Sequence, residues 1–201
     1  MGKIVGSTWV SYVCYDDGVA FVALKYLLVA SLPNLRRLSS KDGEKQFPCL
    51  STLEIEDCGK FSLEGLQSLK KLEMKWCAVK VWAGLKCLTC IENLTIQKCE
   101  EVEGLQHMTA LKNLTLESLP NIEFLLQQLR FEDLPWLSRL FIVDCDKLMS
   151  LPTSLSLSNL ENLSIINCNP ELKKRCEKET GEDWPRIARI PYLRVQAKSE
   201  Y

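Results

Sequence analysis

The chain has 201 residues, enough for one domain or one array of repeats. Its 25 basic and 26 acidic residues leave a net charge of −1, which argues against nucleic-acid binding by bulk electrostatic attraction. The longest apolar stretch, residues 19–32, contains Lys25 and is shorter than the ~20 residues that a membrane-spanning helix needs. Two aspartates precede it, where a signal peptide would have a basic start. These features predict a cytoplasmic chain that neither spans a membrane nor binds nucleic acid.

Residues 1–20 fit no repeating pattern, so we treat them as a separate N-terminal segment. They contain Trp9, Tyr12, Val13 and Tyr15, which could cover a following array only poorly. An exposed first coil would suggest that an upstream part is missing.

Residues 21–168 repeat one pattern seven times: Leu at position 1 (Ile91 in the fourth repeat), Leu at position 4, an apolar residue at position 6, and Cys or Leu at position 9. The repeats begin at residues 24, 50, 69, 91, 111, 137 and 160. Their spacing is close to the 20–29 residues of leucine-rich repeats. Positions 3, 5 and 7 are mostly polar, so each repeat alternates like a strand with one buried face. The pattern predicts an α/β repeat fold: a leucine-rich repeat solenoid, an arc of about seven repeats with a parallel β-sheet on its concave face. Turns and short 3₁₀ segments should connect the strands.

Five of the ten cysteines occupy position 9, which faces inward. A buried free thiol behaves there as a small hydrophobic group, and the other five cysteines show no paired spacing, so we predict reduced thiols. Cys87 and Cys90 have the spacing of zinc ligands, but no second pair accompanies them. The single histidine, His107, has no nucleophile or acid pair beside it. We therefore predict no metal, no cofactor, no catalytic residues and no enzymatic activity.

Residues 169–201 have the features of a C-terminal cap and tail. Asn169 can cap a helix whose first residue is Pro170, residues 171–180 favour a helix, and Gly181 suits its end. The segment that follows offers four apolar side chains to cover the last coil: Trp184, Ile187, Ile190 and Leu193.

Exposed positions of the repeats are the candidate protein-binding residues. Phe141, Val143 and Ile166 are apolar where the pattern calls for polar residues, and adjacent strands would bring them into one patch, rimmed by Arg139 and Asp144. The alternatives are that the C-terminal cap covers this patch or that the exposure is simply tolerated. Trp76 is a second candidate anchor, with packing on its own coil as the alternative. The charged candidates on the concave face are Glu54, Glu56, Lys71, Glu73 and Lys75.

Three repeats match the glycosylation pattern, at Asn93, Asn113 and Asn162. Each asparagine stands at position 3 with Thr or Ser at position 5, which also suits an exposed strand. A cytoplasmic chain would not meet the transferase, so we attribute the pattern to the strand.

These motifs resemble the leucine-rich repeat region, in its C-terminal part, of plant coiled-coil nucleotide-binding leucine-rich repeat disease-resistance proteins. The resemblance rests on the position-9 cysteines with irregular repeat lengths, on LEGLQSLKKLEMKWC (residues 63–77), and on CNPELKKRCEKETGEDWPRIARIPYLRV (residues 168–195). It implies plant defence through binding of a pathogen effector, a host protein guarded by the receptor, or the receptor's own nucleotide-binding domain. The chain has no phosphate loop, so we expect a fragment, a truncated receptor or a free-standing module. A repeat adaptor that recruits substrates to a ubiquitin ligase is the alternative.

Overall fold

The computed structural model describes residues 3–7, 13–15, 18–20, 23–32, 47–58, 62–77, 88–100, 102, 105–151 and 159–198. The candidate zinc-ligand residue Cys87 lies outside these ranges.

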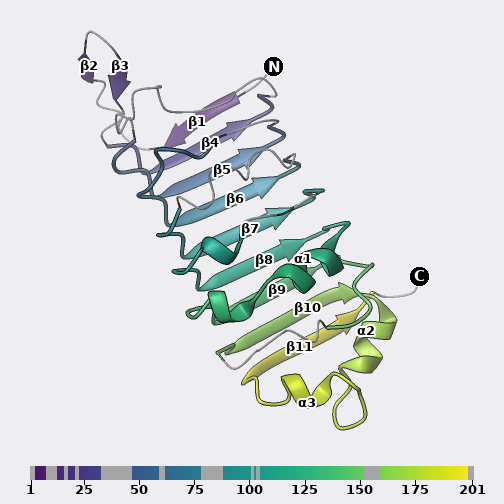
Figure 1. Ribbon diagram of the computed structural model, residues 1–201. Helices are drawn as coiled ribbons and strands as arrows, with labels where there is room; N and C mark the ends of the chain where they lie inside the picture. Colours follow the sequence, from purple (N-terminus) through teal and green to yellow (C-terminus); the bar gives the residue numbers. More distant parts are fainter. Residues whose placement is uncertain are drawn as a thin grey trace.

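Eight strands run parallel in one sheet and follow one another across it in chain order (Figure 1). They are Tyr26–Ala30 (β4), Thr52–Glu56 (β5), Lys71–Lys75 (β6), Asn93–Gln97 (β7), Asn113–Glu117 (β8), Arg139–Val143 (β9), Asn162–Cys168 (β10) and Tyr192–Ala197 (β11). Strands β4 to β10 each begin at position 3 of a predicted repeat. The predicted solenoid with its parallel sheet is therefore confirmed.

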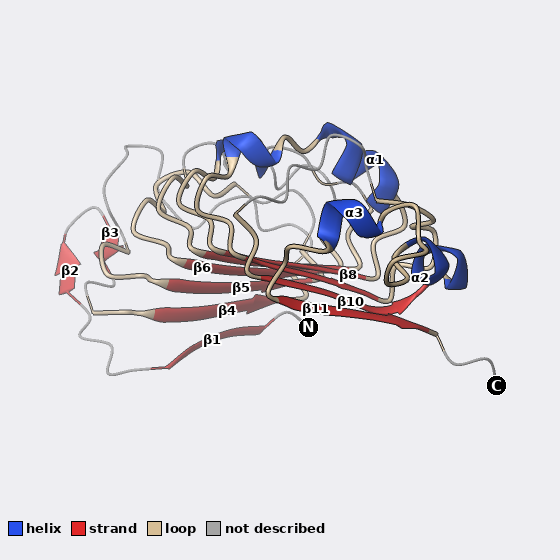
Figure 2. Ribbon diagram, turned by 90° about the horizontal axis from the view of Figure 1, so that it is seen from below, coloured by secondary structure: helices blue, strands red, loops and turns tan. Residues whose placement is uncertain are grey.

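The molecule has two layers, the sheet on one side and the connecting segments with the helices on the other (Figure 2). Within β4 to β9, the side chains at positions 4 and 6 are buried under the connections. The side chains at positions 3, 5 and 7 lie on the opposite side of the sheet and are half-buried or exposed. We call the side that carries positions 3, 5 and 7 the open face. In the described part of the chain, no other element packs against it (Figure 2).

One hydrophobic core fills the space between the two layers. The four apolar positions of all seven repeats are buried in it, except that Leu32 is only partly buried. Each fully buried aliphatic side chain contributes roughly 1.5–3 kcal/mol, so this ladder is the main favourable term in folding.

The start of each strand is fixed by a shared carbonyl. The position-2 oxygen of one repeat accepts hydrogen bonds from the N–H groups of positions 2 and 3 in the next repeat. Lys25 O does so for Ser51 and Thr52, and the same arrangement recurs up to β10. Neighbouring strands therefore begin at the same level.

The end of each strand is a left-handed turn. The position-8 residue of all seven repeats has a φ between 48° and 53°, although none is glycine: Ser31, Asp57, Trp76, Lys98, Ser118, Asp144 and Asn167. In the first six, its N–H donates to the position-7 carbonyl of the next repeat, with N···O distances of 2.9–3.0 Å. This bond offsets part of the cost of about 1–3 kcal/mol for the left-handed conformation.

The position-9 cysteines follow this turn and point inward, as predicted. In four of them the Sγ atom lies 3.2–3.4 Å from the position-7 carbonyl oxygen of the same repeat: Cys58, Cys77, Cys99 and Cys145. A second carbonyl, at position 6 of the preceding repeat, lies 3.6–3.9 Å away. Burial raises the pKa of the Cys58 and Cys145 thiols, which keeps them protonated as donors.

The connections are short, as expected. Leu66 and Leu105 turn into the core, and Gly65 adopts a φ of 84°. Among the described residues, the connection between β7 and β8 contains the 3₁₀ turn Leu105–His107 (η2). The connection between β8 and β9 contains the 3₁₀ turn Phe131–Asp133 (η3) and, before it, the α-helix Ile122–Gln128 (α1), which the repeat pattern did not predict. Helix α1 forms in a 26-residue repeat, where the longer connection leaves room for two helical turns.

The described residues of the N-terminal segment form three strands. Lys3–Ser7 (β1) pairs antiparallel with the whole of β4. Val13–Tyr15 (β2) and Gly18–Ala20 (β3) pair with each other apart from the main sheet (Figure 1). Strand β1 therefore occupies the backbone edge of β4, while Trp9 and Tyr12, which the sequence offered as poor cover, lie outside the described residues.

The C-terminal segment begins as predicted and then differs. Asn169 Oδ1 accepts the N–H of Glu171 at 2.8 Å and caps Pro170–Arg175 (α2), which is shorter than the expected helix over 171–180. The chain then turns back, because Asp183 N–H donates to the Arg175 carbonyl at 2.8 Å. A Cβ on Gly181 would lie 2.2 Å from that carbonyl oxygen, so glycine is required there by contact. A second helix, Trp184–Ile187 (α3), follows.

Asp183 holds this cap to the last repeats. Its carboxylate is buried and accepts hydrogen bonds from Arg175 Nε at 3.0 Å and from the N–H of Leu151 at 3.2 Å. Arg186 also contacts it and donates to the Leu151 carbonyl. Ile187 and Ile190 are buried as expected, while Trp184 and Leu193 are partly buried. The sequence did not predict that β11 would extend the sheet beside β10.

We predict that Asp183→Asn lowers the free energy of unfolding by roughly 3 kcal/mol, because it leaves two arginines without their buried partner. Urea unfolding followed by circular dichroism measures this change. The matched control is Glu182→Gln, which removes the same charge from an exposed carboxylate that also contacts Arg175. It should cost less than about 1 kcal/mol. Equal losses for the two variants would contradict a structural role for Asp183.

We also predict that Cys145→Ala lowers the free energy of unfolding by about 1–2 kcal/mol, because two carbonyls lose their S–H partner and a small cavity remains. Cys49→Ala, at an exposed cysteine, should leave the urea midpoint unchanged. A Cys145→Ala protein as stable as the unmodified chain would mean that neither the S–H group nor the volume of the sulfur contributes to stability.

Candidate functional site

The open face is a lattice of side chains in strict register. Position 3 aligns with position 3 across neighbouring strands, and positions 5 and 7 align likewise. Side chains in one row lie about 4.8 Å apart, and rows along a strand lie about 6.6 Å apart. Three regions of different chemistry follow one another along this lattice.

The first region, on β5 and β6, carries the predicted charged residues, and their charges are largely paired. Lys75 Nζ lies 2.8 Å from the Glu73 carboxylate, and Lys71 Nζ lies 3.9 Å from it. A hydrogen bond to Glu73 raises the pKa of Lys75, and the carboxylates of Glu54 and Glu56 add to this effect. Burial, reinforced by Glu54, raises the pKa of Tyr26 on the adjoining β4.

The second region, on β7 and β8, consists mostly of uncharged polar side chains, with Glu117 as its one acidic residue. Asn113 Nδ2 donates to Asn93 Oδ1 at 2.6 Å, and Gln97 Nε2 donates to Glu117. The two asparagines of the glycosylation pattern therefore bond to each other across neighbouring strands. This agrees with our interpretation that the pattern reflects the strand.

The third region, on β9 to β11, brings together the predicted apolar patch. Val143 lies directly opposite Ile166, and Phe141 lies opposite Ser164. All three apolar side chains are half-buried, and Arg139 beside them is exposed. Strand β11 continues the sheet beside the patch and does not cover it from above.

Strand β11 adds residues to this region that the sequence analysis did not assign. Tyr192 aligns with Asn162, Arg194 with Ser164, and Gln196 with Ile166. Tyr192 is 70% exposed. The alternation of apolar Leu193 and Val195 with polar residues was the available signal, but we interpreted it as cover for the last coil.

A cavity of about 450 Å³ opens in the third region. Five residues from three neighbouring strands and their starts line it: Arg139, Phe141, Glu161, Asn162 and Tyr192. Two of the predicted binding residues, Arg139 and Phe141, therefore share a hollow with the unpredicted Tyr192.

Trp76 and Asp144 lie at the strand-end turns and not on the strands. Trp76 is 47% exposed, and Lys98 Nζ lies 4.9 Å from the centre of its ring. Asp144 is exposed and accepts a hydrogen bond from Asn167 Nδ2 at 2.9 Å. Both residues therefore border the open face at one edge.

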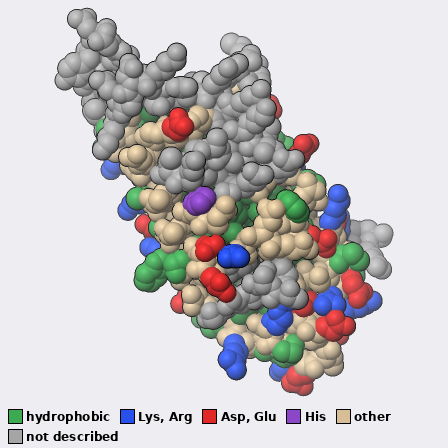
Figure 3. Space-filling view, in the orientation of Figure 1, with side chains coloured by type: hydrophobic (Ala, Val, Ile, Leu, Met, Phe, Trp, Pro, Cys, Tyr) green, Lys and Arg blue, Asp and Glu red, His purple; other side chains and the backbone are tan. Residues whose placement is uncertain are grey.

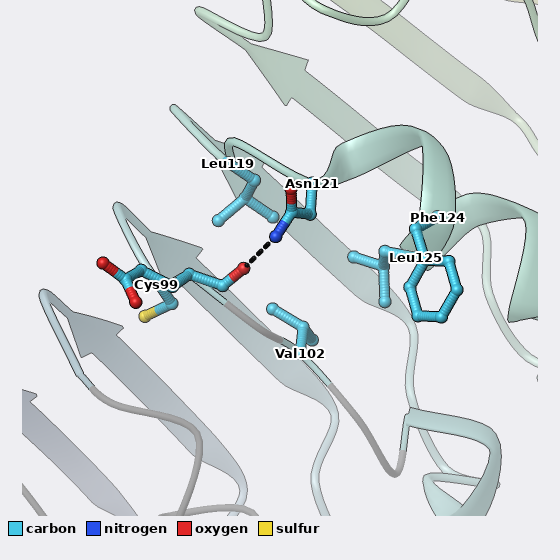
Figure 4. Close-up of a pocket in the computed structure, with 7 residues that line it drawn as sticks. Cys99, Val102, Leu119, Asn121, Phe124 and Leu125 are labelled. Carbon is cyan, nitrogen blue, oxygen red and sulfur yellow. Dashed lines mark hydrogen bonds between the residues drawn. The ribbon is translucent and has the colours of Figure 1, made fainter.

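A second hollow of about 400 Å³ lies on the opposite layer, between the turns after β7 and β8 and helix α1 (Figure 4). Asn121 crosses it to donate to the Glu100 carbonyl at 3.0 Å. Val102, Leu119 and Leu125 give it an apolar wall, and Phe124 on α1 is 61% exposed beside it.

The outer surface of the connecting layer has mixed charge. Where its residues are described, acidic and basic side chains are interspersed over it (Figure 3). Within the described ranges, no three His, Cys, Asp or Glu residues gather as a metal site. No helix in those ranges has the length and apolar character to cross a bilayer.

The repeated strands, the position-9 slot and the two-layer arrangement define the chain as a leucine-rich repeat solenoid. It is similar to RGA4 of Solanum bulbocastanum, a protein named for disease resistance, with 45% identity over 56 residues. The aligned stretch covers 27% of this chain and 6% of that protein. No family model and no solved structure matches the chain. The likeness to the repeat region of a plant disease-resistance protein, indicated by the sequence motifs, is thus confirmed.

We predict that Trp76→Asn leaves the urea midpoint unchanged or raises it. Asparagine adopts the left-handed conformation more readily than a bulky residue, which offsets the loss of a Lys98 contact worth about 0.5–1 kcal/mol. Trp76→Val should lower the midpoint, because a β-branched residue fits that conformation poorly. Marked destabilisation by Trp76→Asn would show that the indole is needed for folding.

Proposed function

We propose that this chain is a protein-recognition module of plant immunity that binds its partner through the open face. The observation that carries the proposal is the free face of eight registered strands, whose exposed residues vary from strand to strand while the core slots stay constant. Such a face presents a large surface to another protein. The named role of the similar Solanum protein supports immunity as the setting.

The partner classes follow from the same resemblance. They are a pathogen effector, a host protein that the receptor guards, or the receptor's own nucleotide-binding domain. The 201 residues carry no phosphate loop, so this segment acts as the recognition part of a receptor and does not itself switch on nucleotide. We further propose that it works in the cytoplasm and performs no catalysis.

The direct test expresses the tagged chain in leaf tissue together with the nucleotide-binding domain of a receptor of the class that the chain resembles. Co-precipitation and cell-death signalling are the two measurements. We expect the chain to bind that domain and to lower its signalling. Photo-cross-linking from open-face positions, in tissue with and without pathogen, extends the test to effectors and host proteins.

Two open-face variants and one matched control decide where binding occurs. Phe141→Glu and Glu54→Lys alter opposite ends of the open face, whereas Phe124→Glu introduces the same charge on α1 in the other layer. At least one open-face variant should reduce partner capture tenfold or more, and Phe124→Glu should not. Loss only with Phe124→Glu, or no protein cross-linked to the open face, would contradict the proposal. Selective capture of a ubiquitin-ligase scaffold would favour the adaptor alternative.

A further inference from the structure

The cavity of the third region arises from the sizes of the side chains around it. On β10 the row positions hold Asn162 and Ser164, which are small, while β9 and β11 carry Arg139, Phe141 and Tyr192. The two outer strands lie about 9.6 Å apart, twice the spacing between neighbours. That gap admits one side chain of an extended peptide between two walls. The floor is formed by β10.

The floor of the cavity contains a hydrogen-bond donor, the side-chain amide of Asn162. Ser164 Oγ donates to Asn162 Oδ1 at 3.1 Å, which fixes the amide orientation. Among the described residues, Asn162 Nδ2 donates to no side chain, so its N–H groups are free for a ligand acceptor. The cavity therefore combines an aromatic wall with a polar floor.

Its electrostatics differ from the rest of the open face. Lys71 and Lys75 on β6 both contact Glu73, and Glu54 and Glu56 on the adjoining β5 balance the remaining positive charge. Within the described ranges, by contrast, neither Arg139 nor Arg194 forms an ion pair; Arg194 donates to Gln196 Oε1 at 2.9 Å. Glu161 stands at the rim as a single exposed carboxylate. Two arginines against one acid leave the site net positive.

The apolar patch adjoins the cavity along the strand direction. Rows 3, 5 and 7 of β9 and β10 run from Arg139 and Asn162, through Phe141, to Val143 and Ile166. Rows about 6.6 Å apart match the spacing of alternate side chains in an extended peptide. An acidic side chain at row 3 would thus place the next two alternate side chains over apolar surface.

We propose that this surface binds an extended peptide segment of a partner protein, with an acidic side chain in the cavity and apolar side chains at the second and fourth positions beyond it. The inference rests on the proposed function and specifies its partner. Arg139 binds the carboxylate through paired N–H donors, and the Asn162 amide adds a third. Tyr192 and Phe141 exclude water from the contact, and Arg194 supplies a second positive charge.

The test measures binding of fluorescein-labelled peptides to the full chain by fluorescence anisotropy. The probe is Ser-Gly-Glu-Ser-Leu-Thr-Leu-Ser-Gly, together with the reverse order, because an extended segment can lie in either direction. Matched peptides replace Glu by Gln, or both Leu by Ser. We expect saturable binding of the Glu peptide in one order, at least fivefold weaker binding of each matched peptide, and weakening by salt.

Variants locate the contact. Arg139→Gln should weaken the Glu peptide at least fivefold and abolish the preference for Glu over Gln. Arg139→Lys should keep part of the preference for the Glu peptide that Arg139→Gln loses, because the positive charge remains while the paired donors are lost. Asn162→Phe fills the hollow without changing charge and should also abolish binding. Lys71→Gln, the same charge change at the same position on β6, should bind normally. Circular dichroism verifies that each variant folds.

No saturable binding in either order, equal binding of the Gln peptide, or an equal effect of Lys71→Gln would overturn the inference. Its failure is separable from failure of the proposed function. A partner cross-linked to the open face in leaf tissue, with no peptide binding, would retain the module's role and reject the acidic segment. Peptide binding without any protein partner in leaf tissue would retain the acidic-peptide site and reject the proposed role of the module.

Discussion

The strand-end turn is the constraint on which the rest of this structure depends. At position 8 of every repeat the backbone enters the left-handed region, and in the first six repeats its N–H reaches the carbonyl of the next coil. The shared carbonyls at the strand starts fix the other end. With both ends of the strands β4 to β9 held, differences in repeat length are confined to the connections. The same two sets of bonds therefore keep the open face in register over irregular repeats.

Much of this architecture could be predicted from the sequence, because the core slots recur. Positions 1, 4, 6 and 9 must all be apolar or thiol to lie under the sheet, and that requirement makes the strands visible. The left-handed turn left no such signal, since its residues range from Ser31 and Asp57 to Trp76 and share no side-chain chemistry. Helix α1 and the contacts of Asp183 could not be predicted from the sequence either. Helix α1 depends on the length of its connection, and Asp183 joins Arg175 and Leu151 from separate segments.

Only part of the candidate site could be predicted from the sequence pattern. Phe141, Val143 and Ile166 could be found because they break the alternation, and parallel register then places them together. Strand β11 was missed although Ile190, Leu193 and Val195 stand at positions 1, 4 and 6 of a further unit, because position 9 is Lys198 and the segment follows a helical cap. Without it, Tyr192 and Arg194 had no place on the face, and the cavity between β9 and β11 could not be inferred. Trp76 and Asp144 border the lattice because position 8 belongs to the turn.

The distribution of charge along the open face determines where a partner gains the most binding free energy. On β5 and β6, Lys75 already has its carboxylate, so a partner that covers this pair must desolvate it and receives little in return. On β9 to β11 the arginines are solvated and without ion pairs in the described part of the chain. A partner that supplies a carboxylate there offsets the loss of water with a new charge-assisted bond, and the neighbouring apolar patch adds hydrophobic burial. Because the open face contributes little to the core, such a site can change with small effect on folding. A solenoid of this kind can therefore keep its stability in the ladder beneath the sheet while its specificity lies in a few side chains above it.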